Sequence, residues 1–368
     1  MVAARLAVQR HTGIQPEVAA AHTLSATEQT DMPTREETEA LLEEQKTLTA
    51  EKKAKPENRR LQEINTRLKE IERKLALRKK GDALSDEEET LQRNGFTQGA
   101  AAWFADVQTM TFLGRPATVH KLLAARLEKA WDMLKDIPVP ADGWVQEGHS
   151  SLRPPGQSLH SFGLAIDLNP GLNPFLLNPK DSKASLYEKH EQSQAIADII
   201  DRASLLVLGK SPSQEAFFDK PAAPDKSARV EATYDKLAEA SEALEHYLAL
   251  GAEANAGELQ LRVLALKAFD KDPEHRSAKA WTKAIAQDRK KLGEKASIKD
   301  WLQPETGFLH LDKRLVKAMT DTAGGGLTWL GDETIASGRD IMHFDMRGVG
   351  PIQKIYRSGQ GEIWLVGG

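Results

Sequence analysis

The apolar residues of this chain follow different patterns in different regions. Between residues 35 and 80 they recur at steps of three and four, as in a coiled-coil seam: Leu61, Ile64, Leu68, Ile71 and Leu75. Pro56 can start the helix that carries them and Gly81 can end it. A helical pattern with an acidic start and a basic end precedes Pro56. We therefore predict an antiparallel helical hairpin, which serves either as a solvated spacer or as a pairing or targeting module.

Short apolar runs separated by glycine and proline replace this pattern up to about residue 180. The segment that holds Phe112, Gly114 and Val119 predicts a short strand and a turn. A following amphipathic helix has its apolar stripe at Leu122, Leu123, Leu127 and Trp131. Helical spacing then returns, and short β-like runs such as "DIMHFDMRG" and "EIWLVGG" close the chain.

These patterns predict an α+β chain in five parts. Residues 1–34 are expected to form a flexible tail, and residues 35–96 a coiled-coil-like hairpin with an acidic connector. A catalytic domain with a small antiparallel sheet would then have its first half in residues 97–183 and its second half in residues 301–368. Residues 184–300 would be a helical insertion between the two halves.

Composition narrows the classes of function. The chain has 368 residues, of which 40% are apolar and 28% charged, as in ordinary globular proteins. Its net charge of −4 gives no basic field for nucleic acid. No apolar run approaches the ~20 residues of a membrane-spanning helix, and the N-terminus lacks the apolar core of a secretory signal. Cysteine is absent, which excludes disulfides and thiolate metal sites.

The stretch "QSLHSFGLAIDLNPGLNPF" places His160 seven residues before Asp167. That spacing is too long for one helix face, but a turn at Gly163 can bring both side chains to one site. The run "LAID" then predicts a short buried strand that ends in the carboxylate. A second segment, "GRDIMHFDMRG", offers His343 on another strand.

Two histidines and one carboxylate form a ligand set suited to a single Zn²⁺ ion. Such a set leaves a fourth coordination position open, as catalytic zinc requires. Asp340, three residues before His343, can act as a general base there. Taken alone, each residue could also have a purely structural role. Buried histidines are usually core residues, and Asp167 could cap the turn that follows. The combination predicts a zinc site of His160, Asp167 and His343.

These segments resemble the motifs of the D-alanyl-D-alanine metallopeptidases. "SLHSFGLAID" is similar to Ser-x-His-x-x-Gly-x-Ala-x-Asp, and "DIMHFD" to the second motif, an acidic residue three positions before a histidine. "LTWLGDETIASGRDIMHF" resembles the Trp-Gly-Gly segment of the endolysin-like branch, and "SSLRPPGQSLH" an arginine-containing loop. The wider group includes vancomycin-resistance dipeptidases, phage L-alanyl-D-glutamate endopeptidases, lysostaphin-type enzymes and hedgehog domains. The resemblance covers roughly residues 97–182 and 300–366.

The resemblance implies roles for further residues. Arg153 would stabilise the tetrahedral oxyanion or bind a substrate carboxylate, although it could also form a surface ion pair. Ser158 and Trp329 would be substrate contacts, with a loop hydrogen bond and a core position as their respective alternatives. Two departures stand out. Many relatives have Glu where Asp340 stands, and the Trp-Gly-Gly segment reads Trp329-Leu330-Gly331 here.

The resemblance also implies a function. We expect a zinc-dependent peptidoglycan hydrolase that cleaves a stem-peptide bond next to a D-amino acid, as an endopeptidase or a D,D-carboxypeptidase. The alternative is a zinc-bearing but non-catalytic binding module of the cell wall or of a protein. Without a recognisable signal peptide, such an enzyme would be made in the cytoplasm and reach the wall by lysis, non-Sec export or injection. The segment "ARLAVQRHTG" faintly resembles leaders of bacterial toxin-domain proteins. In such an effector, the N-terminal helices would bind a delivery or docking partner.

Overall fold

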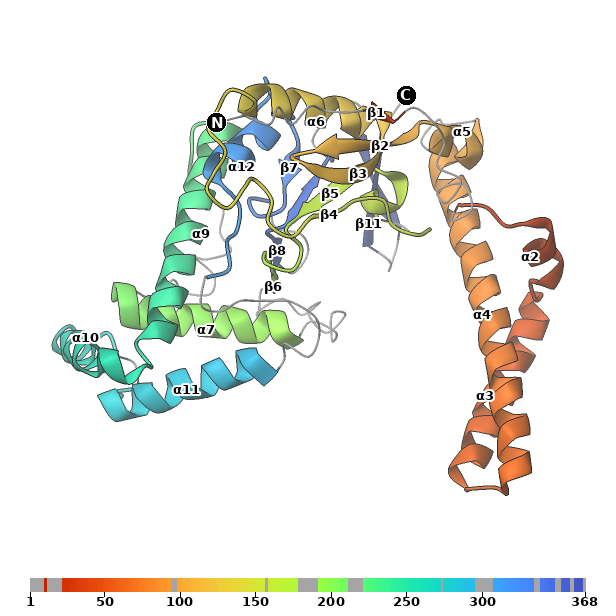
Figure 1. Cartoon of the computed structure of the whole chain (residues 1–368), viewed down its shortest axis with the longest axis horizontal. Helices are drawn as coiled ribbons and strands as arrows, with labels where there is room; N and C mark the ends of the chain where they lie inside the picture. The colour runs from red at the N-terminus through yellow and green to blue at the C-terminus, as the bar shows by residue number, and fades with distance from the viewer. Residues whose placement is uncertain are drawn as a thin grey trace.

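The fold combines many helices with small antiparallel sheets, as the α+β assignment predicted (Figure 1). The computed structural model describes residues 10–11, 22–93, 98–155, 158–177, 191–210, 221–272, 274–294, 307–333, 338–347, 352–357 and 361–366. None of the helices in these ranges is long and apolar enough to span a membrane.

The N-terminal helical hairpin consists of α3 (Arg35–Lys53) and α4 (Asn58–Arg93), which extend away from the rest of the chain (Figure 1). The predicted seam is confirmed, because Ile64 and Ile71 of α4 are buried against Leu41 and Leu48 of α3. The predicted end at Gly81 is wrong, since α4 continues to Arg93 through most of the expected acidic connector.

Packing explains why Gly81 lies inside a helix. A Cβ atom at this position would collide with the sulfur of Met32. Glycine therefore lets the segment before α3 pass close to α4, and it stops no helix here. The residues that follow it, Glu87 and Leu91, are fully buried, and Leu91 belongs to the main core.

The expected flexible tail is ordered where the structure describes it. The short helix α2 (Ala26–Asp31) begins with a capping box made by Ser25 and Glu28. His22 is buried, with Nδ1 3.1 Å from Glu87 and its ring stacked on Phe104. The strand β1 (Arg10–His11) pairs with β2. These partners lie more than 60 residues away in sequence, which is why local composition did not indicate them.

A β-hairpin and a helix follow the expected pattern. The strands β2 (Val107–Phe112) and β3 (Arg115–His120) pair antiparallel around Leu113 and Gly114, both at positive φ. The helix α6 (Lys121–Leu134) begins directly after β3 and buries Leu123 and Leu127. The short helix α5 (Gly99–Ala105) precedes this unit and buries Trp103 and Phe104.

A four-stranded sheet holds the residues of interest. Its strand order is β4-β5-β9-β7, and all its pairings are antiparallel. The four strands are β4 (His149–Ser150), β5 (Ala165–Leu168), β9 (His343–Asp345) and β7 (Thr328–Trp329). The 3-10 helix η1 (Leu159–Phe162) immediately precedes β5. Two further pairs are β6 (Phe175–Leu177) with β8 (Gly338–Asp340), and β10 (Ile352–Arg357) with β11 (Gly361–Val366).

The helices predicted after residue 184 form as expected. They are α7 (Glu191–Leu208), α9 (Lys226–Ala249), α10 (Ala256–Ala268) and α11 (Ala278–Glu294), with the 3-10 turn η3 (Glu253–Asn255) before α10. The last helix of the chain, α12 (Lys313–Thr320), packs near α6 and α9 (Figure 1).

This block is more than an appended insertion, because α9 is tied to the second half of the expected catalytic domain. The Ser241 hydroxyl accepts hydrogen bonds from the backbone N–H groups of Phe308 and Leu309. Buried residues of α7 and α9 also belong to one continuous core with β5, β9 and α12. The helices of residues 184–300 are therefore not simply inserted beside the expected domain, since α9 shares one core with its strands.

Candidate metal centre

The register of two strands brings residues from distant parts of the sequence together. Asp167 on β5 pairs with His343 on β9, so their side chains are neighbours on one face of the sheet. His160 lies on η1, which ends at Gly163 in the left-handed conformation, φ 68°. A Cβ at Gly163 would lie only 2.7 Å from the backbone nitrogen of His120. Glycine is needed both for the turn and for this close approach.

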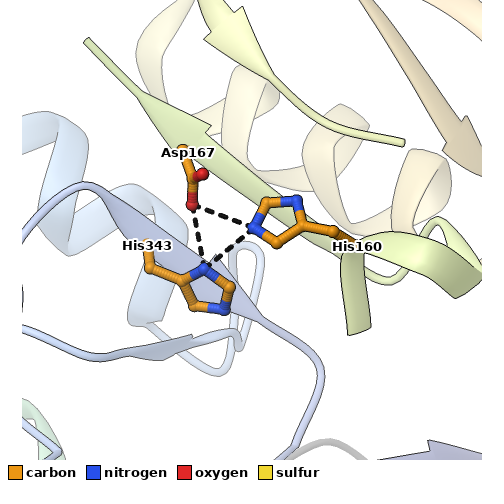
Figure 2. A group of neighbouring side chains, drawn as sticks. All are labelled: His160, Asp167 and His343. Atoms are coloured by element: carbon orange, nitrogen blue, oxygen red, sulfur yellow. Dashed lines mark hydrogen bonds and ion pairs between the residues drawn. The ribbon is translucent and has the colours of Figure 1, made fainter. Parts of the chain in front are cut away.

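The three predicted ligands form a compact buried group that could hold a metal ion (Figure 2). His160 Nε2 lies 3.0 Å from Asp167 Oδ1 and 3.0 Å from His343 Nδ1. The third distance, from His343 Nδ1 to Asp167 Oδ1, is 2.9 Å. Ligands about 2.0–2.2 Å from one tetrahedral metal lie only slightly farther apart than this. In the described part of the chain this is the one such group.

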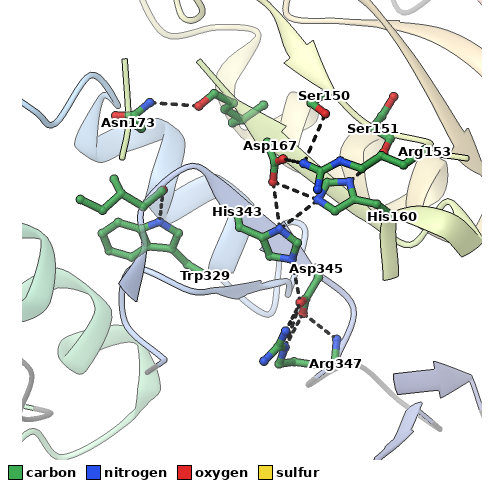
Figure 3. A network of polar contacts seen from close by, with 12 residues as sticks. Ser150, Ser151, Arg153, His160, Asp167, Asn173, Trp329, His343, Asp345 and Arg347 are labelled. Carbon is green, nitrogen blue, oxygen red and sulfur yellow. Dashed lines mark hydrogen bonds and ion pairs between the residues drawn. The ribbon is translucent and has the colours of Figure 1, made fainter. Parts of the chain in front are cut away.

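Outer hydrogen bonds orient both imidazole rings toward this triangle (Figure 3). His160 Nδ1 donates to the Ser151 carbonyl oxygen at 2.7 Å. His343 Nε2 donates to Asp345 Oδ2 at 3.0 Å. In each ring the proton on the outer nitrogen leaves the inner nitrogen available as a ligand. This is the arrangement by which proteins usually fix metal-binding histidines.

Asp345 is itself held by a basic residue. It accepts hydrogen bonds from the backbone N–H of Arg347 at 2.9 Å and from Arg347 Nε at 2.8 and 3.1 Å. Its carboxyl group is fully buried, and its contacts with His343 and Arg347 hold its pKa below the usual range despite burial. Asp345 therefore carries a charge that is already paired, so it orients His343 and is not poised to accept a proton.

The metal-free group holds a proton that an ion would displace. Burial opposes ionisation of Asp167, but hydrogen bonds from His160 and His343 keep the pKa of its carboxyl well below the usual range. Burial likewise favours neutral His343, yet hydrogen bonds to Asp167 and Asp345 raise the pKa of its imidazole to about 10. Burial lowers the pKa of His160. Metal binding requires neutral imidazoles, so it is coupled to loss of the His343 proton.

Asp340 differs from the other acidic residues near the centre. It is the last residue of β8, three positions before His343. Its Oδ1 is buried and has no hydrogen-bond partner among the described residues. Burial raises the pKa of its carboxyl to about 7; the charge of His343 opposes this shift, and the charge of Asp167 adds to it. A carboxyl group with a pKa near neutrality can both accept and return a proton.

The remaining predicted residues fall into three different settings. The Arg153 guanidinium bonds to Asp167 Oδ2, while its side chain stays 48% exposed. Ser158 is exposed, with its hydroxyl 3.5 Å from that of Ser161. Trp329 is only 1% exposed and donates its indole N–H to the Ile341 carbonyl at 2.8 Å. Arg153 can thus reach a ligand at the centre, whereas Trp329 presents no surface to one.

Sequence reasoning did not assign Asp345, Arg347 and the Ser151 carbonyl to the centre as orienting groups. For Asp345 a signal existed, because in "HFD" it stands two residues after His343 and so on the same side of the strand. The Ser151 carbonyl carried no signal, since any residue supplies that atom. Comparison with known proteins adds no further assignment: no family model, curated protein or solved structure matches the chain.

Proposed function

We propose that this chain is a zinc-dependent peptidase that hydrolyses a peptide bond next to a D-amino acid in the stem peptide of peptidoglycan. One observation carries the proposal. Three ligand atoms converge within 3.0 Å of one another although His343 lies 176 residues after Asp167 and 183 after His160, and both outer imidazole nitrogens are already engaged. A histidine–histidine–carboxylate set of this kind suits zinc and leaves room for a further ligand.

The neighbouring residues favour catalysis over a purely structural ion. Structural zinc sites are normally closed by four protein ligands, usually with cysteine among them, and this chain has no cysteine. When bound, zinc would supply Lewis-acid polarisation of the scissile carbonyl and activation of water. Asp340 would accept the proton of the attacking water and return it to the leaving amine. Arg153 would bind either a carboxylate of the substrate or the negative charge that develops on the carbonyl oxygen.

The substrate class rests on the resemblance of four ordered motifs to the D-alanyl-D-alanine metallopeptidases. The structure supports part of this by bringing two of those motifs, residues 158–167 and 340–343, to one place. The half-exposed Arg153 at the centre suits a substrate with a free or developing negative charge. Both a carboxypeptidase and an endopeptidase would use such a group.

The direct test is digestion of purified peptidoglycan by the zinc-loaded full-length chain, with the products identified by mass spectrometry. The proposal expects cleaved stem peptides, or a released D-amino acid if the enzyme is a carboxypeptidase. Asp340→Asn should retain zinc but lose turnover, because an amide cannot take the proton. Asp142→Asn, an exposed carboxylate outside both motifs, is the matched control and should remain active.

The same experiment distinguishes a peptidase from the alternative, a zinc-bearing binding module without catalytic activity. Such a module would bind zinc and pull down with peptidoglycan but release no product. Turnover equal to wild type in Asp340→Asn would contradict the assigned base. Absence of any product from a zinc-loaded wild-type chain would contradict the peptidase itself.

A further inference from the structure

A second feature of the chain lies among the helices after residue 190. A cavity of about 380 Å³ opens between one face of α7 and the segment that joins α10 to α11. None of the residues of the metal centre lines it. From α7 it receives Asp198, Asp201, Arg202 and Leu205, which share a helix face at steps of three, one and three. Its volume falls at the lower end of the ~300–1,000 Å³ typical of small-molecule sites.

The charge of the lining favours a cationic ligand. Five carboxylates and three basic side chains line the cavity, an excess of two negative charges. One of the basic side chains, Arg202, is already engaged outside the cavity, because it donates to both oxygens of Asp288 at 2.6 and 2.9 Å. Within the lining, Arg276 pairs with Glu274, and carboxylates still outnumber basic side chains among the other lining residues.

Three buried polar atoms of the lining lack partners among the described residues. Asp272 is 2% exposed, and its Oδ1 accepts from the Glu274 N–H while its Oδ2 has no partner. Trp281 is 1% exposed and its indole N–H is likewise unpaired. The third atom is Nη1 of Arg276. Buried polar atoms are almost always paired, so one acceptor and two donors at one cavity indicate a ligand with complementary groups.

A single metal ion does not fit these groups. No three carboxylates of the cavity come close enough to one another to share an ion, since the only such group among the described residues is the metal centre. The cavity also has apolar surface from Leu205, whereas the Trp281 ring is buried beneath the Arg276 guanidinium at 4.7 Å. An extended organic cation with an aliphatic part matches both features.

We propose that this cavity binds a lysine-like side chain within a peptide. The ammonium group would pair with the Asp272 carboxylate, and the aliphatic part would lie along Leu205. A peptide carbonyl oxygen would accept hydrogen bonds from the Trp281 and Arg276 N–H groups. A free diamine offers the ammonium group but no carbonyl, so it binds more weakly. The inference stands independently of the metal centre and of its proposed activity.

The test is isothermal titration calorimetry of the full-length chain with three probes. Nα-acetyl-lysine amide carries both the ammonium and the carbonyl groups, cadaverine carries only ammonium groups, and Nα-acetyl-norleucine amide carries only carbonyls. The proposal expects affinity to fall in the order acetyl-lysine amide, cadaverine, acetyl-norleucine amide. Tighter binding of cadaverine would identify a free diamine as the ligand and overturn the peptide assignment. Equal binding of the norleucine probe, or no binding of the lysine probe at millimolar concentration, would overturn the site.

Two substitutions locate the binding. Asp272→Asn keeps the shape of the side chain but removes its charge. It should lower the affinity for acetyl-lysine amide by about tenfold or more. Trp281→Phe removes one N–H donor. It should lower the affinity for acetyl-lysine amide by about fivefold and leave the affinity for cadaverine unchanged.

Glu245→Gln is the matched control, because Glu245 is an exposed carboxylate of α9 outside the cavity. It should change the affinity for neither probe. A thermal melt verifies that each variant is folded. Folded Asp272→Asn and Trp281→Phe variants with wild-type affinity would contradict the proposal.

Discussion

The α3–α4 hairpin and the metal centre are stabilised in opposite ways. The hairpin buries an apolar seam that includes Ile64 and Ile71, and its charged residues pair across a solvated surface. The metal centre instead buries His160, Asp167 and His343 in mutual contact, and Asp345 hydrogen-bonds to His343. Apolar burial favours folding directly, whereas buried charges contribute little net stability and persist where they serve a function. The hairpin is therefore stabilised by its own apolar contacts, while the buried polar group is one that could hold a metal ion.

The largest effect should come from removing a ligand at the centre. In His343→Ala, Asp167 loses a charge-assisted partner and the metal loses one of three protein ligands, so most of the metal should be lost. Metal analysis of the purified variant measures this. Ile71→Ala in the hairpin is the contrasting variant and should keep its full metal content. A His343→Ala chain with wild-type metal content would remove His343 from the ligand set.

A change in the hairpin seam should act on stability alone. Ile71 is fully buried, so Ile71→Ala should destabilise the hairpin by about 2–5 kcal/mol. Leu42→Ala is the matched control, since Leu42 is 50% exposed on α3 and should cost far less. Hydrogen exchange of the α3 and α4 amides reports the difference. Loss of metal affinity in Ile71→Ala would show that the hairpin and the metal centre are coupled and are not stabilised independently.

An orienting residue should matter less than a ligand. Asp345→Asn leaves an acceptor for His343 Nε2–H but removes the charge and weakens the contacts with Arg347. Metal affinity should fall by about 10–100-fold, as is typical for partners of metal-binding histidines. Competition with a chelator measures the affinity. Unchanged affinity would mean that Asp345 serves packing and not orientation.

The metal-free chain should show the effect of Asp340 as a pH dependence of stability. Burial raises the pKa of this carboxyl from the usual value to about 7, so the folded state prefers it protonated. Its contribution to stability is therefore complete below the unfolded-state pKa and is lost as pH rises through 7. Asp340→Asn should be more stable than wild type at pH 8, by about 1–3 kcal/mol, and closer to it at pH 5. Urea unfolding of both chains at the two pH values provides the comparison. A stability difference that is independent of pH would contradict this environment for Asp340.

The smallest effect should come from a surface ion pair of the hairpin. Arg67 donates to both oxygens of Glu44 at 2.7 and 2.8 Å, and more than a third of each side chain is exposed. Glu44→Gln should therefore cost less than about 1 kcal/mol, and less still at high salt. Thermal melts at low and high ionic strength measure both. A cost as large as that of Ile71→Ala would show that charge pairing, and not the seam, holds the hairpin together.

Local patterns predicted the elements of the fold better than their connections. The seam at Ile64 and Ile71 and the buried strand around Asp167 were readable because each depends on residues close in sequence. The end of α4 was misjudged because Gly81 accommodates Met32, a contact that no local pattern shows. The order of the segment around His22 was missed for the same reason, since its partners are Glu87 and Phe104.

For the candidate site, too, the sequence predicted the local features but not the long-range ones. His160, Asp167, His343 and Asp340 could be predicted because their types and spacing form a recognisable ligand and base set. Their mutual distances could not be predicted, because they depend on the register between β5 and β9 across 176 residues. The role of α9 in the core was also hidden, since Ser241 looks like an ordinary helix residue until Phe308 and Leu309 are seen to bond to it.

X-ray absorption spectroscopy at the zinc edge, on the full-length chain loaded with one equivalent of zinc, would identify the ligands of the bound ion. We expect a mononuclear ion with two imidazole nitrogen ligands and oxygen ligands from Asp167 and solvent, at about 2.0–2.2 Å. His343→Ala should lose one imidazole contribution from the spectrum or lose the ion altogether. A spectrum of wild-type protein with no imidazole ligands, or one left unchanged by His343→Ala, would contradict the assignment of His160, Asp167 and His343 as a metal site.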